Sequence, residues 1–144
     1  MGRELCPLMK RIGFEVVLLD DRPDFASSQM HPDADRIILC DYADIYSCIS
    51  IEKNDFVVIM THGHIGDRDV LLQVCRSEAG YIGCIGSRKK VEGTAAFLRE
   101  NGISDEKISS IHSPIGLPIG GSSPQEIAVS VAAEIIQCRY KENI

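Results

Sequence analysis

Asp20 and Arg22 are the first residues of this sequence whose types and position could bind a ligand. They follow an apolar run, and an acidic residue that ends a strand binds the ribose hydroxyls of a nucleotide in dinucleotide-binding folds. If Gly2 is the last glycine of a G-x-G-x-x-G fingerprint, Asp20 lies about 20 residues beyond the first glycine, as the fingerprint requires. Arg22 would equally meet a 2′-phosphate, so NAD and NADP both stay open, and an aspartate at this place is as often a turn former.

Gly86, Ser87 and Arg88 form a second candidate site, where an apolar run passes into a helical pattern. Free backbone N–H groups and a hydroxyl at the start of a helix stabilise an anion such as phosphate. Basic residues in a first turn oppose the helix dipole, so their presence favours a bound anion. The alternative is a capped helix whose basic first turn is only solvated.

Thr61, His62 and Asp67 follow another apolar run, in the segment THGHIGD. Two histidines and an aspartate invite a metal interpretation, but the histidines are one residue apart and no third ligand follows at a regular distance, so we predict no metal site. We expect hydrogen-bonding or helix-capping roles instead, with Asp67 as the N-cap of the next helix. No nucleophile and base stand together beside His62, so no catalytic residue is predicted.

The segment 113–124 is a long apolar loop that contains Pro114 and Gly116. Loops of this length inside a compact domain are usually functional. Proline and glycine fix a shape, which suits a flat ligand or a partner surface. The alternative, equally favoured, is that the loop is only a stiff connection that covers the end of the sheet and binds nothing.

The elements that must position these residues alternate along the chain. Short runs rich in Val and Ile alternate with helical patterns, which is typical of an α/β fold with a parallel sheet. We predict strands at 15–20, 36–40, 55–60 and 81–85, and a weaker fifth strand at 109–112. Apolar stripes predict helices that carry residues 5–12, 70–75 and 91–98, with a weaker helix at 43–49.

The last helix has the clearest start. Ser123 and Glu126 form a capping box with Pro124 at the first helical position, so the orphan backbone donors are satisfied at once. We expect its apolar side to carry Ile127, Val131 and Ile135, and its polar side Ser130, Glu134, Gln137 and Lys141.

Length and composition limit the class of protein. A chain of 144 residues with 44% hydrophobic and 25% charged residues predicts one globular domain, residues 1–144, and excludes a disordered or low-complexity protein. The net charge of -6 argues against a nucleic-acid partner. No apolar run reaches about 18 residues and the start lacks a signal-peptide pattern, so we expect a cytoplasmic protein without a membrane segment. The 6 cysteines form no C-x-x-C pair, so we expect reduced, buried thiols.

Five motifs in register resemble the C-terminal Rossmann-like domain of the xanthine dehydrogenase accessory proteins, the XdhC/CoxI family. The motifs are DDRPDFA, THGHxxD, YIGCIGSRKK, HSPIGLPIG and SPQEIAVSVAAEI, and the resemblance runs from Gly2 to about Arg139. It implies a Rossmann-like, doubly wound, mostly parallel sheet. The strand and glycine loop that precede Gly2 in the family are absent from the sequence, as is the N-terminal domain that carries the family's proposed cofactor-contacting cysteine.

The resemblance implies an accessory or chaperone function in the maturation of molybdenum hydroxylases such as xanthine dehydrogenase. Family members bind the molybdenum cofactor, as molybdopterin or its dinucleotide, protect it during sulfuration and deliver it, so a cofactor sulfurase and a second copy of the chain are further expected partners. A non-catalytic accessory protein is favoured over two alternatives, an NAD(P)-dependent oxidoreductase and a nucleotide-sensing regulatory domain. By resemblance the ligand cleft is lined by Asp20, Arg22, Thr61, His62, Gly86, Ser87, Arg88, Pro114, Gly116 and Leu117.

Overall fold

The computed structural model describes residues 1–141, and for His64, Ile65 and residues 88–91 it describes the backbone only. The chain forms two compact units. Unit 1 consists of residues 1–42 together with the segment from residue 116 onward, and unit 2 consists of residues 43–115. The expected single domain over residues 1–144 stays a prediction.

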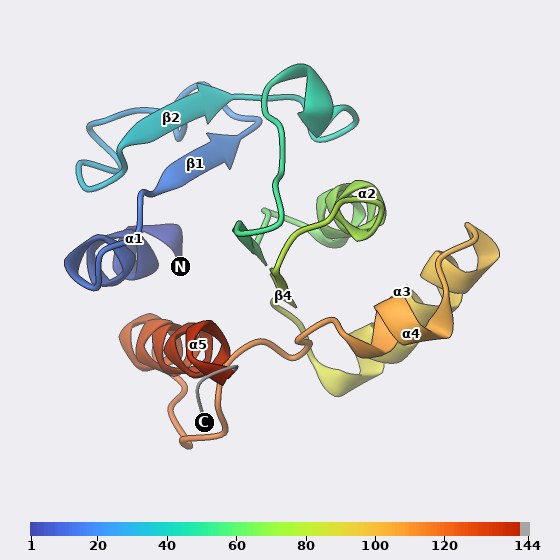
Figure 1. Ribbon diagram of the computed structural model, residues 1–144. Coiled ribbons are helices and arrows are strands. Elements are labelled where there is room, and N and C mark those ends of the chain that lie inside the picture. The colour runs from blue at the N-terminus through green and yellow to red at the C-terminus, as the bar shows by residue number, and fades with distance from the viewer. Residues whose placement is uncertain (142–144) are drawn as a thin grey trace. The chain divides into compact units, whose positions relative to one another are not determined.

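Unit 1 contains a parallel pair of strands and two long helices. The helix α1 (Gly2–Arg11) leads to β1 (Val17–Asp20), and β2 (Arg36–Leu39) pairs with β1 in parallel, so that Asp20 is opposite Leu39 (Figure 1). Cys40 continues the ladder, since its N–H donates to the Asp20 carbonyl over 3.0 Å. The strands predicted at 15–20 and 36–40 are therefore confirmed with slightly shorter ends, and Asp20 lies at a carboxyl strand end.

The second long helix of unit 1, α5 (Pro124–Arg139), packs against α1. Leu5 and Met9 of α1 are buried, as are Val131 and Ile135 of α5. The capping box is confirmed, because the Ser123 hydroxyl accepts a hydrogen bond from the Glu126 N–H at 3.2 Å and the Glu126 carboxylate accepts one from the Ser123 N–H at 2.9 Å. At the other end of the helix, Arg139 donates to the Ile12 carbonyl over 3.0 Å and stacks on the Phe14 ring at 3.7 Å.

The expected polar side of α5 is wrong at two positions. Ser130 and Glu134 are buried, with 9% and 8% of their surfaces exposed. The Ser130 hydroxyl donates to the Leu117 carbonyl over 2.6 Å, and the Glu134 carboxylate accepts from the Gly116 N–H at 3.2 Å. A loop that passes over this face brings backbone groups that need partners, and the two polar side chains supply them.

Unit 2 alternates helices with a second parallel pair of strands. Its strands β3 (Phe56–Ile59) and β4 (Tyr81–Cys84) pair in parallel, which confirms the α/β class with parallel strands. The helix α2 (His64–Cys75) follows β3, and α3 (Arg88–Glu100) follows β4. The weak helix predicted at 43–49 is one 3-10 turn, η1 (Ile45–Ser47).

The fifth strand predicted at 109–112 is mostly wrong. Ser104 caps a short helix, α4 (Asp105–Ser109), by accepting a hydrogen bond from the Lys107 N–H, and this helix takes the start of the predicted strand. What remains is a single parallel bridge between His112 and Gly83. A Cβ atom at Gly83 would lie 2.6 Å from the Tyr81 hydroxyl and against Ile115, so the close approach of the chain at this bridge requires glycine.

The structure addresses two expectations about the chain, one about membrane-spanning helices and one about the state of its cysteines. Within residues 1–141, no helix is long and apolar enough to cross a membrane. All 6 cysteines are free thiols, and four of them (Cys6, Cys40, Cys75 and Cys84) are buried. Reduced thiols with mostly buried side chains are therefore confirmed.

We predict that Gly116→Ala destabilises the chain more than Gly120→Ala. Both glycines have positive φ angles, 97° and 86°, but a Cβ atom at Gly116 would collide with Ser130, whereas nothing lies within 4 Å of one at Gly120. Chemical denaturation should show a loss of about 1 kcal/mol for Gly120→Ala and about 3 kcal/mol for Gly116→Ala, because the latter adds a steric clash. Equal losses would mean that the loop is not held against α5.

Candidate functional site

Three chain segments of unit 2 leave the carboxyl edge of its strand pair at adjacent points. The Ile85 N–H donates to the Ile59 carbonyl over 2.9 Å, which continues the ladder past β4. The Ser113 hydroxyl and the Ile115 N–H both donate to the Cys84 carbonyl, at 3.1 and 3.2 Å. The segments that leave this edge carry five of the predicted site residues, namely Thr61, His62, Gly86, Ser87 and Pro114.

The turn after β3 is closed by Asp67, but not as predicted. The helix α2 begins at His64 with Gly63 as its N-cap, and Gly63 has a φ of 106° that favours glycine. Asp67 therefore lies in the first turn of α2, and the N-cap assignment is wrong. Its carboxylate accepts hydrogen bonds from the Thr61 N–H and hydroxyl at 2.9 and 2.6 Å, so Thr61 holds the turn in shape and His62 is left exposed.

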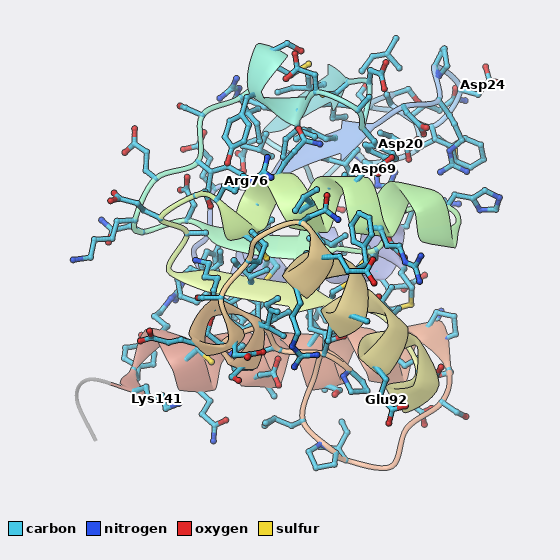
Figure 2. The ribbon with its side chains drawn as sticks, turned by 90° about the vertical axis from the view of Figure 1, so that its right-hand side faces the viewer. Asp20, Asp24, Asp69, Arg76, Glu92 and Lys141 are labelled. Atoms are coloured by element: carbon cyan, nitrogen blue, oxygen red, sulfur yellow. The ribbon has the colours of Figure 1, made fainter. Side chains whose placement is uncertain are left out.

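The helix starts at this edge differ from those of α4 and α5, whereas the N-cap of α1 likewise makes no side-chain hydrogen bond. The N-caps of α4 and α5, Ser104 and Ser123, accept hydrogen bonds through their side chains, whereas Gly63 and Ser87 at the starts of α2 and α3 make no such bond. The first turn of α3 contains no acidic residue, and Glu92 follows it (Figure 2). Uncapped N–H groups and the positive end of the α3 dipole are therefore available to an anion, whereas Asp67 already places a negative charge in the first turn of α2.

Two of the residues considered for this edge have side chains outside the described part of the chain. Arg88 supplies the first residue of α3, and its side chain is not described. The same holds for His64, the second histidine of the metal interpretation. Among the described residues, no group of three or more His, Cys, Asp or Glu side chains could hold a metal ion.

Cys84 is the thiol closest in sequence to the Gly86 turn. Burial, and to a smaller extent the Asp67 carboxylate, raises the pKa of this thiol to about 12. Burial also raises the pKa of Cys75 to about 11. Both thiols are protonated at neutral pH, and a protonated thiol is neither a nucleophile nor a good metal ligand.

Asp20, which Figure 2 labels, forms a closed pair with Arg22 in unit 1, at the carboxyl end of β1. The Arg22 guanidinium donates through Nε to Oδ1 and through Nη2 to Oδ2 of Asp20, both at 2.9 Å, and the Arg22 N–H donates to Oδ1 at 3.0 Å. The guanidinium also lies 3.8 Å above the Phe25 ring. The hydrogen bonds from Arg22 hold the pKa of the Asp20 carboxyl below its usual range.

This pairing determines what the two residues can offer a ligand. A carboxylate accepts about four hydrogen bonds, and Arg22 uses three of these positions, so Asp20 keeps room for one donor such as a ribose hydroxyl. The positive charge of Arg22 is balanced by Asp20, which weakens its attraction for a 2′-phosphate. Only 13% of the Asp20 side chain is exposed, so little space is left for this further donor.

Two residues near Asp20 were missed by the sequence reasoning. Burial, and to a smaller extent the Asp20 and Asp21 carboxylates, raises the pKa of Tyr42 to about 12. Tyr42 follows β2, and the parallel pairing of β2 with β1 could have indicated its place. His31 lies in the connection between the strands, where no sequence pattern indicated that its side chain is buried and close enough to Asp20 to interact with it electrostatically.

The loop residues Pro114 and Gly116 fall in different units. Pro114 belongs to unit 2 and follows a cis peptide bond from Ser113. Gly116 belongs to unit 1, where Glu134 and Ser130 of α5 hold the loop backbone. The stiffness expected of this loop therefore comes from buried polar side chains as well as from its prolines and glycines.

We predict that Arg22→Ala lowers stability at neutral pH by roughly 1 kcal/mol, a figure that allows for solvent screening of the half-exposed pair. Because Arg22 depresses the folded-state pKa of Asp20, its contribution is present above about pH 4, the unfolded value, and is lost as the pH falls through the folded value. Urea denaturation should therefore show a large gap between the two proteins at pH 7 that closes toward pH 2. A gap independent of pH would contradict the assigned pair.

The sequence comparisons cover nearly the whole chain. The XdhC Rossmann domain model matches residues 1–135. The uncharacterized protein YqeB of Escherichia coli (strain K12) is 30% identical over 140 residues, which are 96% of this chain and 26% of that protein. A probable xanthine dehydrogenase subunit of Bacillus subtilis (strain 168) is 33% identical over 137 residues, which are 95% of this chain and 39% of that protein.

A solved structure agrees with these matches. The crystal structure of a xanthine dehydrogenase from Bacillus halodurans has a TM-score of 0.82 and 34% sequence identity, over 97% of this chain and 40% of that chain. The chain thus spans well under half the length of each of these relatives. The match over residues 1–135, together with the parallel strands and the helices that follow them, shows that the chain belongs to the XdhC Rossmann domain family.

Proposed function

We propose that this chain is the ligand-binding Rossmann domain of a xanthine dehydrogenase accessory protein. The ligand is the molybdenum cofactor, as molybdopterin or its dinucleotide, and the recipient is a molybdenum hydroxylase of the xanthine dehydrogenase type. The proposal draws on the family and on two relatives whose names refer to xanthine dehydrogenase. The observation that carries it is the carboxyl edge of unit 2, where two uncapped helix starts accompany the turns after β3 and β4.

The phosphate group of the ligand is the part that this edge suits best. The N–H groups at the start of α3, the Ser87 hydroxyl and the positive charge of Arg88 all favour an anion. Thr61 and Asp67 hold the neighbouring turn in one shape, which leaves His62 exposed beside it.

Binding and transfer without turnover fit the chemistry of this edge better than catalysis. The pKa values of the Cys75 and Cys84 thiols are raised to about 11 and 12, so neither thiol is poised to attack a ligand. A carrier needs reversible contacts, and hydrogen bonds to a phosphate are reversible. We therefore place sulfuration on a separate cofactor sulfurase and hydroxylation on the recipient enzyme, and we include a second copy of the chain among the expected partners.

One observation favours a second candidate, the binding of NAD or NADP. Asp20 lies at the carboxyl end of a parallel strand with room for a ribose hydroxyl. An NAD(P)-dependent oxidoreductase would bind the nicotinamide nucleotide and transfer hydride, whereas a nucleotide-sensing domain would bind it without turnover. Reduction of the bound nucleotide in the presence of candidate substrates separates the two.

The direct test is equilibrium binding of molybdenum cofactor released from a purified hydroxylase, in parallel with NAD, NADP and ADP. We expect saturable binding of the released cofactor without turnover, followed by its appearance in an added cofactor-free hydroxylase. Hydride transfer from a bound nicotinamide nucleotide, without cofactor binding, would replace this proposal with the oxidoreductase.

We predict that Arg88→Ala weakens cofactor binding about tenfold, the loss of one charge-assisted contact to phosphate, and reduces its dependence on salt. Arg99→Ala is the matched control on the same helix, because Arg99 pairs with Asp105 at the opposite end of α3. Ser123→Ala is the stability control and should cost about 1 kcal/mol of unfolding free energy without changing affinity. Equal affinities of Arg88→Ala and the unaltered chain would contradict an anion site at α3.

A further inference from the structure

The helix α3 of unit 2 ends in an exposed Asn-Gly pair, Asn101 and Gly102. Asn101 is the C-cap residue, and Gly102 follows with a φ of 83°, a conformation that favours glycine. A Cβ atom at Gly102 would have nothing within 4 Å of it, so the chain is open to solvent there. Asparagine is thermolabile, and its side-chain amide reacts most readily when the next residue is glycine, which has no side chain to hinder the attacking backbone nitrogen.

Hydrogen bonds to the last turn of α3 hold both groups that would react. The Asn101 side chain donates through Nδ2 to the Phe97 carbonyl over 2.8 Å. The Gly102 N–H donates to the Arg99 carbonyl over 3.0 Å. These bonds satisfy carbonyl groups at the end of the helix. They also keep the side-chain amide and the Gly102 nitrogen on separate partners, so the two groups do not react while the turn is closed.

An ion pair spans the same turn from outside. Arg99, in the last turn of α3, donates through Nε to Oδ1 of Asp105 over 2.6 Å. Asp105 is the first residue of α4, so the pair joins the end of one helix to the start of the next across the Asn-Gly turn. The two side chains are 55% and 75% exposed, so the pair contributes little and the closed turn exchanges with an open one.

We infer that Asn101 is a site of spontaneous deamidation in the folded chain, and that opening of the last turn of α3 controls its rate. In the open turn, hydroxide removes the proton of the Gly102 nitrogen, which attacks Cγ of Asn101. The new N–Cγ bond closes a succinimide ring, and the Cγ–Nδ2 bond breaks as ammonia leaves. Water then opens the ring to aspartate or isoaspartate, and no electrons are transferred. The reaction does not involve the ligand, so it goes beyond the proposed function.

The product weakens the end of α3. An ionised carboxylate has no proton to donate, so the hydrogen bond from residue 101 to the Phe97 carbonyl is lost. The new negative charge lies at the negative end of the helix dipole, where it is unfavourable. Isoaspartate also adds a methylene group to the main chain, which distorts the turn. Deamidation therefore loosens the connection between α3 and α4, at the end of α3 that is opposite to Ser87.

The experiment incubates the full chain at mildly alkaline pH and follows the peptide that contains residue 101 by mass spectrometry. We expect the mass change from amide to acid, both aspartate and isoaspartate in the product, and a rate that rises with hydroxide concentration. Asn54 is the internal control, because it is also exposed but precedes Asp55, and it should react much more slowly. Asn101→Gln should abolish the change in this peptide. A folded chain in which Asn101 reacts no faster than Asn54 would overturn the inference.

Two variants with the same loss of charge test the control by the turn. Asp105→Ala removes the ion pair and should raise the rate about threefold. Glu106→Ala, the matched control in the same exposed first turn of α4, should leave the rate unchanged. If Asp105→Ala does not fold, Arg99→Ala removes the same ion pair from its other side.

Unfolding supplies the upper limit of the rate. In concentrated urea the unaltered chain should deamidate at Asn101 about thirtyfold faster than in the folded state, because both hydrogen bonds of the closed turn are then absent. Equal rates in the folded and unfolded chain, or equal rates in Asp105→Ala and Glu106→Ala, would show that the turn does not control the reaction and would overturn the inference.

Discussion

Parallel pairing of short strands is the constraint on which the rest of this structure depends. In each unit, two strands of four residues run in the same direction, so the turns that follow them leave from one edge. Because every backbone donor and acceptor near that edge needs a partner, the turns are held by side chains of the same unit. Asp67 holds the turn after β3, and Arg22 and Asp20 hold the turn after β1. The starts of α2 and α3, like that of α1, are left without side-chain caps.

Buried polar side chains also give the loop before α5 its shape. Ser130 and Glu134 look like solvent-facing residues in a helical pattern, but both contact the backbone at Gly116 and Leu117. A positive φ at Gly116 allows the chain to approach Ser130 closely. These contacts hold the backbone of the loop against α5.

The strands, the long helices and the capping box could be predicted because local patterns of apolar residues and caps determine them. The weak fifth strand could not, because the helix that Ser104 starts takes its first residue, Ser109, and only the bridge at His112 forms. Asp67 looked like a helix cap because aspartate has that preference, but Gly63 starts α2 earlier and turns Asp67 back toward Thr61. The surroundings of His31 were out of reach, since its burial depends on contacts with α1 and β1 and on no periodic signal in its own loop.

The division of the chain into an interrupted unit and a continuous one has a consequence for biosynthesis. Unit 2 is encoded by one uninterrupted stretch, residues 43–115, so all its internal contacts are available before α5 leaves the ribosome. The contacts of unit 1 can form only after α5 has been synthesised, because α1 packs against α5 and the hydrogen bond from Arg139 to Ile12 joins residues 127 positions apart. Until then the apolar side of α1 lacks the helix that covers it in unit 1.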